Sequence, residues 1–188
     1  MSDLTSLARL RLCHASDDAL LYDIFCTTWQ SEVAALPNQN LAQHVLRIQH
    51  IAQERRFAKA HPGYERFVVM EDGEPAGRLY VHRTDTKVEI VDLTLLTAYR
   101  SRGIGTALVR ELFELATRED LVISLRVGRR QRRVTEFYLR LGFDLVDVDD
   151  LDNTFEWTPA RVEASQAGSQ AESLVESADQ LHQATPRA

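Results

Sequence analysis

A short stretch of the sequence, residues 93–106 (LTLLTAYRSRGIGT), combines residue types that bind phosphate groups. An apolar strand pattern ends there, the chain turns through Arg100, Arg102, Gly103 and Gly105, and a helical pattern begins. The N–H groups at the start of a helix lack intrahelical partners and lie at the positive end of its dipole, which favours anions. Glycines let the backbone approach a phosphate, and arginines add charge-assisted hydrogen bonds. The stretch predicts a pyrophosphate site, although it lacks the third glycine of a dinucleotide-binding turn and the Gly-Lys-Thr of a phosphate loop.

Strands and helices with clear periodicity surround this turn and must position it. Apolar residues that alternate with polar ones, or form short apolar runs bounded by turns, predict strands, and apolar residues at helical spacing predict helices. The strands are expected at residues 8–13, 67–70, 76–81, 88–96, 121–127, 143–149 and 153–158, and the helices at 16–28, from 38 or 40 to about 52, 104–115 and 134–141. The order β-α-α-β-β-β-α-β-α-β-β indicates a mixed α/β domain with no internal repeat.

In the second predicted helix, Leu41, Val45, Ile48 and Ala52 share one face. Apolar residues at this spacing are typical of an amphipathic helix. We therefore expect this face to be the apolar stripe of the helix.

Composition limits the class of protein and the number of domains. The 188 residues suit one domain, residues 1–159, followed by a tail, residues 160–188, that has no aromatic residue. This tail is either disordered or forms a short amphipathic helix that contacts a partner. The net charge of −6 argues against a general nucleic-acid binder, and no apolar run could cross a membrane. Because there is no signal-peptide pattern either, we expect a cytoplasmic protein.

The chain resembles the GNAT superfamily of acyl-CoA-dependent N-acetyltransferases in two motifs separated by a predicted strand. The first is the turn at residues 100–105 (RSRGIG), and the second is FYLRLGF at residues 137–143. Residues 72–81 (DGEPAGRLYV) also resemble the second hairpin of that family, and the likeness extends over about residues 8–158. It implies a mixed, mostly antiparallel sheet of about seven strands, with four helices on both faces and splayed strands at the cofactor site.

The resemblance also implies which residues hold the cofactor, acetyl-CoA. The strand segment Leu93, Thr94 and Leu95 matches the backbone that binds pantetheine, and the N–H of Leu95 would stabilise the oxyanion. Gln131 stands near the place where many members carry a cofactor-binding asparagine. The remaining expected contacts form the pyrophosphate cradle: Arg100, Ser101, Arg102, Gly103, Ile104, Gly105 and Thr106.

The catalytic residues implied by the resemblance are an acid and a base. Tyr138 matches the tyrosine that protonates the departing CoA thiolate. The acceptor amine, whose pKa is around 10, must lose a proton before it attacks, and Glu89 stands where some members carry the base. Asp92 is a second candidate, but residues 89 and 92 lie on opposite faces of an ideal strand, so only one should face the acceptor unless a bulge intervenes. Purely structural roles for both carboxylates remain the alternative.

A basic cluster and the histidines have less specific meanings. The cluster is either a solvated helix start or a site for a CoA phosphate or an acidic substrate; it comprises Arg126, Arg129, Arg130, Arg132 and Arg133. The histidines and the two cysteines show no typical metal-ligand spacing, so no metal ion is expected.

The function predicted from these residues is direct transfer of an acetyl group from acetyl-CoA to a primary amine. A small-molecule acceptor is favoured over a protein. The alternative is a weakly active acyl-CoA-binding sensor or partner-binding module, and a nucleic-acid binder that uses the arginines is a third, less favoured reading. The family resemblance also allows a homodimer.

Overall fold

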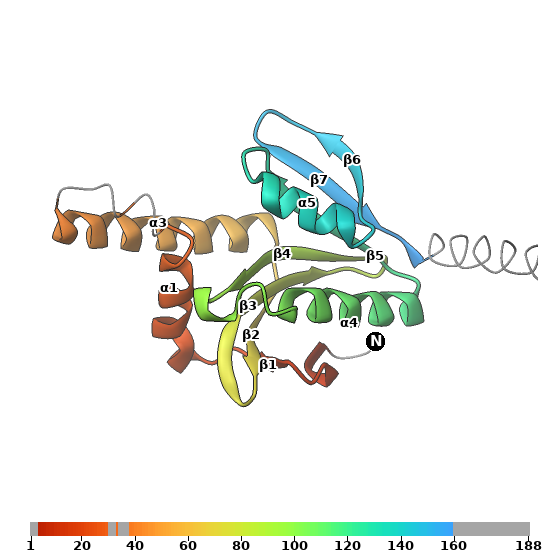
Figure 1. Cartoon of the computed structure of the whole chain (residues 1–188), viewed down its shortest axis with the longest axis horizontal. Coiled ribbons are helices and arrows are strands. Elements are labelled where there is room, and N and C mark those ends of the chain that lie inside the picture. Colours follow the sequence, from red (N-terminus) through yellow and green to blue (C-terminus); the bar gives the residue numbers. More distant parts are fainter. Residues whose placement is uncertain (1–3, 30–32, 34–37, 160–188) are drawn as a thin grey trace, which may run out of the picture.

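A seven-stranded sheet in the order β1-β2-β3-β4-β5-β7-β6 forms the centre of the protein (Figure 1). The computed structural model describes residues 4–29, 33 and 38–159. All neighbouring strands are antiparallel except β4 and β5, which are parallel. The strands are β1 (Leu10–Leu12), β2 (Glu65–Glu71), β3 (Glu74–Arg83), β4 (Lys87–Leu95), β5 (Val122–Gly128), β6 (Asp144–Val148) and β7 (Asp152–Trp157). The predicted mixed, mostly antiparallel sheet is confirmed.

Helices cover both faces of this sheet. They are α1 (Asp18–Cys26), α3 (Gln39–Ala60), α4 (Ile104–Glu119) and α5 (Arg132–Arg140), with 3-10 turns at Leu4–Ser6, Ala15–Asp17 and Thr97–Tyr99. Leu79 of β3 packs in the main core together with Leu108 and Leu112 of α4. Tyr80, the next residue on β3, packs with Leu21 and Ile24 of α1 on the opposite face. Alternation along β3 therefore separates an α4 layer from an α1–α3 layer. None of the described helices is long and apolar enough to span a membrane.

The apolar face predicted for the second helix, now α3, exists but points to solvent. Leu41 is 54% exposed and Ile48 is 65% exposed, and Val45 and Ala52 are exposed as well. The side that faces the protein instead carries both apolar and polar residues: Ala42, Leu46, His50, Gln53, Glu54 and Phe57. The inner face of α3 is partly polar because its side chains contact a buried arginine of the sheet. The most hydrophobic face of the helix is therefore the one that points to solvent.

A β-bulge in β4 changes which side chains share a face. His82 of β3 is paired with Glu89, but Tyr80 is paired with Asp92, so β4 has one extra residue between them. Because residues 80 and 82 point to the same face of β3, Glu89 and Asp92 also point to one face, the one covered by α1 and α3. The bulge is the exception that the sequence argument left open, and because of it both carboxylates face that side.

An ion pair fastens β1 to the segment that leads into α1. Both guanidinium Nη atoms of Arg11 donate to the carboxylate of Asp17 at 2.9 Å, and the backbone N–H of His14 donates to it at 2.7 Å. These bonds, those from Arg11 foremost, lower the pKa of Asp17 to about 2.

This pair predicts how stability depends on pH. Since the pKa of Asp17 is lower in the folded chain than the ordinary value of about 3.9, its contribution is present above about pH 4 and is lost as the pH falls through about 2. We expect Asp17→Asn to lower the unfolding free energy at neutral pH and to remove up to about one proton from the linkage slope between these values. Urea unfolding at several pH values measures both effects. Asp85→Asn, in the exposed β3–β4 turn, is the matched control, and an equal loss of slope there would contradict the assignment.

Candidate functional site

A cleft opens where β4 separates from β5. The pairing of these parallel strands ends at Ile90 and Leu125, while β4 continues to Leu95. Beyond this point lies a cleft of about 490 Å³ between the end of β4, the start of α4 and α5. Its walls include nine residues predicted from the sequence: Leu93, Leu95, Arg100, Ser101, Gly103, Ile104, Gly105, Thr106 and Tyr138. The structure thus brings both sequence motifs to one place.

The turn before α4 has the backbone geometry of an anion cradle. Ser101 and Gly103 have positive φ angles of 58° and 81°, and Gly103 is the N-cap of α4. A side chain at residue 103 would be strained in this conformation, which explains the glycine. Because the first N–H groups of a helix have no intrahelical acceptor, those of α4 are available to phosphate oxygens at the cleft.

Arginines of this region take different positions. The Nε of Arg100 donates to the carbonyl oxygen of Leu95 at 2.9 Å, and its Nη2 donates to Oγ1 of Thr27 at 3.0 Å. Arg100 therefore ties the end of β4 to the end of α1 while it also borders the cleft. Arg102 lies over the ring of Tyr99, 5.4 Å from its centre, and does not line the cleft.

Two other residues predicted to contact the cofactor lie away from the cleft. Thr94 is buried on the opposite face of β4, where its hydroxyl donates to the carboxylate of Asp92 at 3.2 Å. Gln131 precedes α5, and its side chain lies beside Gly128. For Thr94 the reason is strand alternation, which turns its side chain away from the wall that Leu93 and Leu95 form.

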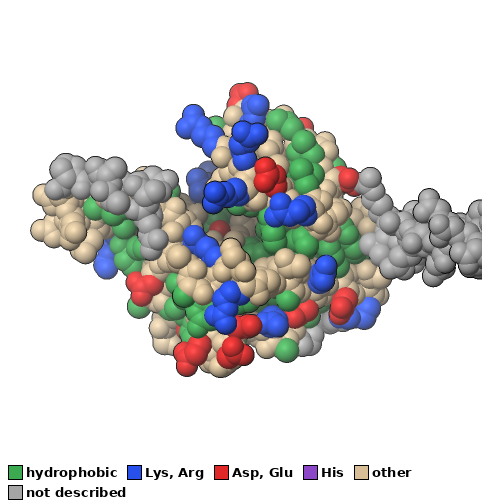
Figure 2. All heavy atoms as spheres, viewed as in Figure 1, with side chains coloured by type: hydrophobic (Ala, Val, Ile, Leu, Met, Phe, Trp, Pro, Cys, Tyr) green, Lys and Arg blue, Asp and Glu red, His purple; other side chains and the backbone are tan. Residues whose placement is uncertain are grey.

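Residues of α5 add basic and apolar surface that the cofactor motif did not predict. Arg133 and Arg140 line the cleft together with Val134 and Phe137. Figure 2 shows Lys and Arg side chains gathered around the hollow between α5 and the start of α4. Arg133 belongs to the basic cluster noted in the sequence. Arg140 was not predicted, because it lies two helical turns after Arg133, outside that cluster. By contrast, Arg126 of the same cluster is ion-paired with Asp149.

The Tyr138 side chain closes the inner end of the cleft. It is buried and packs against Phe137 and Phe143, with ring centres 5.0 and 5.3 Å away. Burial, and to a smaller extent the negative charge of Asp92, raise the pKa of the Tyr138 hydroxyl well above its usual value. The hydroxyl therefore stays protonated at neutral pH, and it is a weaker acid than a free phenol.

Asp92 belongs to a buried polar network beneath α3. Its Oδ2 accepts a hydrogen bond of 2.7 Å from Nε of Arg78, whose side chain is only 1% exposed. Arg78 also donates to Oε1 of Gln53 at 3.1 Å and lies 3.7 Å from Oε1 of Glu54. The carboxylate of Asp92 is thus already committed to an ion pair in the folded protein.

Glu89 has a different setting, further back along the same strand. Its Oε2 is 3.2 Å from Nδ1 of His61, which follows α3, and 4.0 Å from Nδ1 of His82 on β3. The carboxylate is about a quarter exposed, so solvent reaches it. Glu89 therefore remains open to a proton from outside, in contrast to Asp92.

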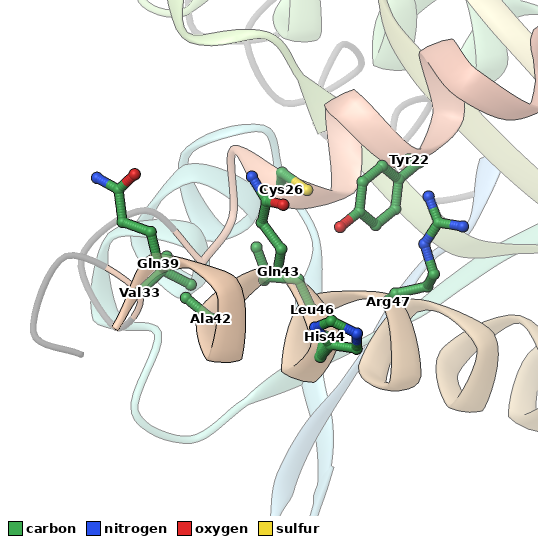
Figure 3. A pocket seen from close by; sticks show the side chains of 9 residues that line it. All are labelled: Tyr22, Cys26, Val33, Gln39, Ala42, Gln43, His44, Leu46 and Arg47. Atoms are coloured by element: carbon green, nitrogen blue, oxygen red, sulfur yellow. The ribbon is translucent and has the colours of Figure 1, made fainter. Parts of the chain in front are cut away.

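A wide groove of about 750 Å³ lies between α1 and α3 (Figure 3). In Figure 3, Tyr22 and Cys26 come from α1, and the side chain of Arg47 on α3 lies near the Tyr22 ring, 5.6 Å from its centre. Tyr22 of α1 thus lines the groove. The groove reaches the end of α1, where Thr27 meets Arg100 of the cradle, and its size suits a small molecule.

Comparison with known proteins finds similarity to acetyltransferases. Residues 20–143 match the Acetyltransferase (GNAT) family. An uncharacterized N-acetyltransferase of Methanocaldococcus jannaschii is 31% identical over 90 residues, which cover 44% of this chain and only 40% of that relative. The structure of PaiA N-acetyltransferase from Thermoplasma acidophilum, in complex with coenzyme A, superposes with a TM-score of 0.60 at 19% identity, covering 79% of this chain and 97% of that one. An acetyltransferase from Thermus thermophilus gives a TM-score of 0.57 at 17% identity, with coverage of 79% and 95%.

Proposed function

The chain belongs to the GNAT family of acetyltransferases, and from this membership we propose that it transfers an acetyl group from acetyl-CoA to a primary amine of a small molecule. The observation that carries the proposal is the cleft, in which the open end of β4, the glycine turn and Tyr138 face one another. The groove between α1 and α3 supports a small acceptor, because its volume of about 750 Å³ is that of a small-molecule site.

In the proposed complex, pantetheine lies along Leu93–Leu95, where β5 would lie if its pairing with β4 continued. The pyrophosphate lies on the 101–106 turn. Arg133 and Arg140 at the mouth of the cleft supply positive charge for the phosphates. Gln131 and Arg102 would act only indirectly, since neither lines this cleft, and Thr94 would contribute only its backbone.

The proposed reaction is a direct attack in a ternary complex. The amine nitrogen attacks the thioester carbon, a C–N bond forms, and the C–S bond breaks. The N–H of Leu95 stabilises the negative oxygen that develops, and Tyr138 gives its proton to the CoA sulfur. The products are the acetylated amine and CoA.

Glu89 is the better of the two candidates for the base that accepts the amine proton. Asp92 is held by Arg78 at 2.7 Å and by the hydroxyl of Thr94, whereas Glu89 reaches solvent. Because Glu89 lies six residues before Leu95 on β4, we propose that the proton travels to it through water. Asp92 then has a positioning role beneath the strand that binds pantetheine.

Calorimetric titration with acetyl-CoA tests the proposed cofactor site. We expect Arg133→Glu to raise the dissociation constant roughly 10- to 100-fold, because a charge that pairs with a phosphate is reversed. Arg118→Glu is the matched control: it makes the same charge change on an exposed residue at the far end of α4, so it should bind nearly as wild type. Equal losses in the two variants would point to a general charge effect and contradict a local contact.

Thiol release from acetyl-CoA with a panel of primary amines then tests the transfer itself. Release that depends on an amine, with formation of the acetylated product, supports the proposed function. Tight binding of acetyl-CoA with no release for any amine would favour the alternative, an acyl-CoA-binding module. No binding at all would contradict both.

A further inference from the structure

We propose that His61, His82 and Glu89 form a binding site for one divalent transition-metal ion. One ligand atom from each residue lies within 4.8 Å of the others. The Nδ1 atoms of both histidines approach the same oxygen, Oε2 of Glu89, at 3.2 and 4.0 Å. Two ligands of a single zinc ion are roughly 3.0–3.5 Å apart, so a side-chain movement of about 1 Å completes the set.

The three ligands come from rigid elements, which favours a prearranged site. His82 and Glu89 are direct cross-strand partners on β3 and β4. His61 ends α3, where its N–H donates to the carbonyl oxygen of Phe57 at 2.8 Å and its own carbonyl accepts from Tyr64 at 3.1 Å. Fixing ligands on strands and on a hydrogen-bonded helix end lowers the entropy lost on binding. The irregular spacing of 61, 82 and 89 explains why the sequence did not suggest this site.

The chemistry of the donors selects the type of ion. Two imidazole nitrogens and one carboxylate oxygen suit zinc, cobalt, nickel or iron(II), whereas magnesium and calcium prefer oxygen ligands alone. The three side chains are 19–25% exposed, so an ion can enter from solvent and keep open positions for water.

This site has a consequence that rests on the proposed function. An ion bound to Glu89 would withhold that carboxylate from the amine proton, so metal-loaded protein should transfer acetyl groups more slowly than protein treated with a chelator. The site is therefore expected to inhibit the reaction rather than to take part in it.

Titration of chelator-treated protein with zinc chloride, followed by calorimetry, tests the site without any substrate. We expect one ion per chain with a roughly micromolar dissociation constant. His82→Ala and the isosteric Glu89→Gln should each raise that constant by at least about 100-fold, since removing a ligand costs more than disturbing its surroundings. His44→Ala, on the exposed side of α3, is the matched control and should bind as wild type. Circular dichroism and thermal unfolding establish that each variant is folded.

The outcomes separate the metal site from the proposed reaction. Absence of zinc binding by the wild type overturns the site. Binding by Glu89→Gln and His82→Ala that is as tight as that of the wild type overturns it as well. Both proposals are supported if these variants lose zinc binding and the zinc-loaded wild type forms acetylated product more slowly than the chelator-treated wild type, as measured by mass spectrometry. If the variants lose zinc binding but zinc leaves product formation by the wild type unchanged, the site is supported and Glu89 is ruled out as the base.

Discussion

Replacement of Tyr138 by phenylalanine should lower kcat by roughly 10²–10⁴-fold, the usual contribution of a positioned acid, and leave the affinity for acetyl-CoA nearly intact. The variant keeps the ring that packs between Phe137 and Phe143 and removes only the hydroxyl. Since burial raises the pKa of that hydroxyl, it is protonated at neutral pH in the wild type, and the substitution removes this proton together with the oxygen. Steady-state kinetics with saturating acetyl-CoA and calorimetry with CoA measure the two quantities.

Tyr80→Phe is the matched control for this experiment. Tyr80 is a fully buried tyrosine of β3, and its hydroxyl has no hydrogen-bond partner among the described residues. We expect kcat of this variant to stay near the wild-type value. A wild-type kcat in Tyr138→Phe would mean that water protonates the thiolate, whereas a raised dissociation constant for CoA would assign Tyr138 to binding.

Local signals in the sequence were sufficient to predict the turn that borders the cleft. The glycines and Arg100 of the turn act through backbone conformation and short-range contacts, and the structure indeed places a positive φ at Gly103 and a hydrogen bond from Arg100 to Leu95. The order of helices and strands along the chain followed from hydrophobic periodicity, which is most reliable for long elements with a single apolar face. The mixed, mostly antiparallel sheet followed instead from the resemblance to the family.

Features that depend on tertiary contacts could not be predicted in the same way. The bulge in β4 has no marker in the sequence, yet it decides that Glu89 and Asp92 share a face. The buried side of α3 carries His50, Gln53 and Glu54 because Arg78 lies beneath it, and a hydrophobic pattern cannot register such a polar contact. His61 approaches Glu89 only because the end of α3 folds back over the sheet.

Substitution of Arg78 by methionine is expected to lower the free energy of unfolding by about 3–5 kcal/mol. Arg78 is 1% exposed, and its removal leaves the half-buried carboxylate of Asp92 without its partner at 2.7 Å. It also leaves Oε1 of Gln53 without its donor. Since Asp92 and Thr94 are linked on the strand whose other face borders the cleft, the variant should bind acetyl-CoA more weakly as well. Urea unfolding and calorimetry measure the two effects.

Two comparison variants decide whether the unpaired charge causes this loss. Arg126→Met removes an arginine from another Arg–Asp pair of the sheet, that with Asp149, but both partners are exposed, and we expect little change in stability. Arg78→Met combined with Asp92→Leu removes both charges of the pair and should recover most of the lost stability, because an ion pair shielded from water can often be replaced by apolar side chains. If the double variant is as unstable as Arg78→Met alone, lost packing rather than the orphaned carboxylate is responsible, and Asp92 would not need Arg78 to hold the cofactor strand in place.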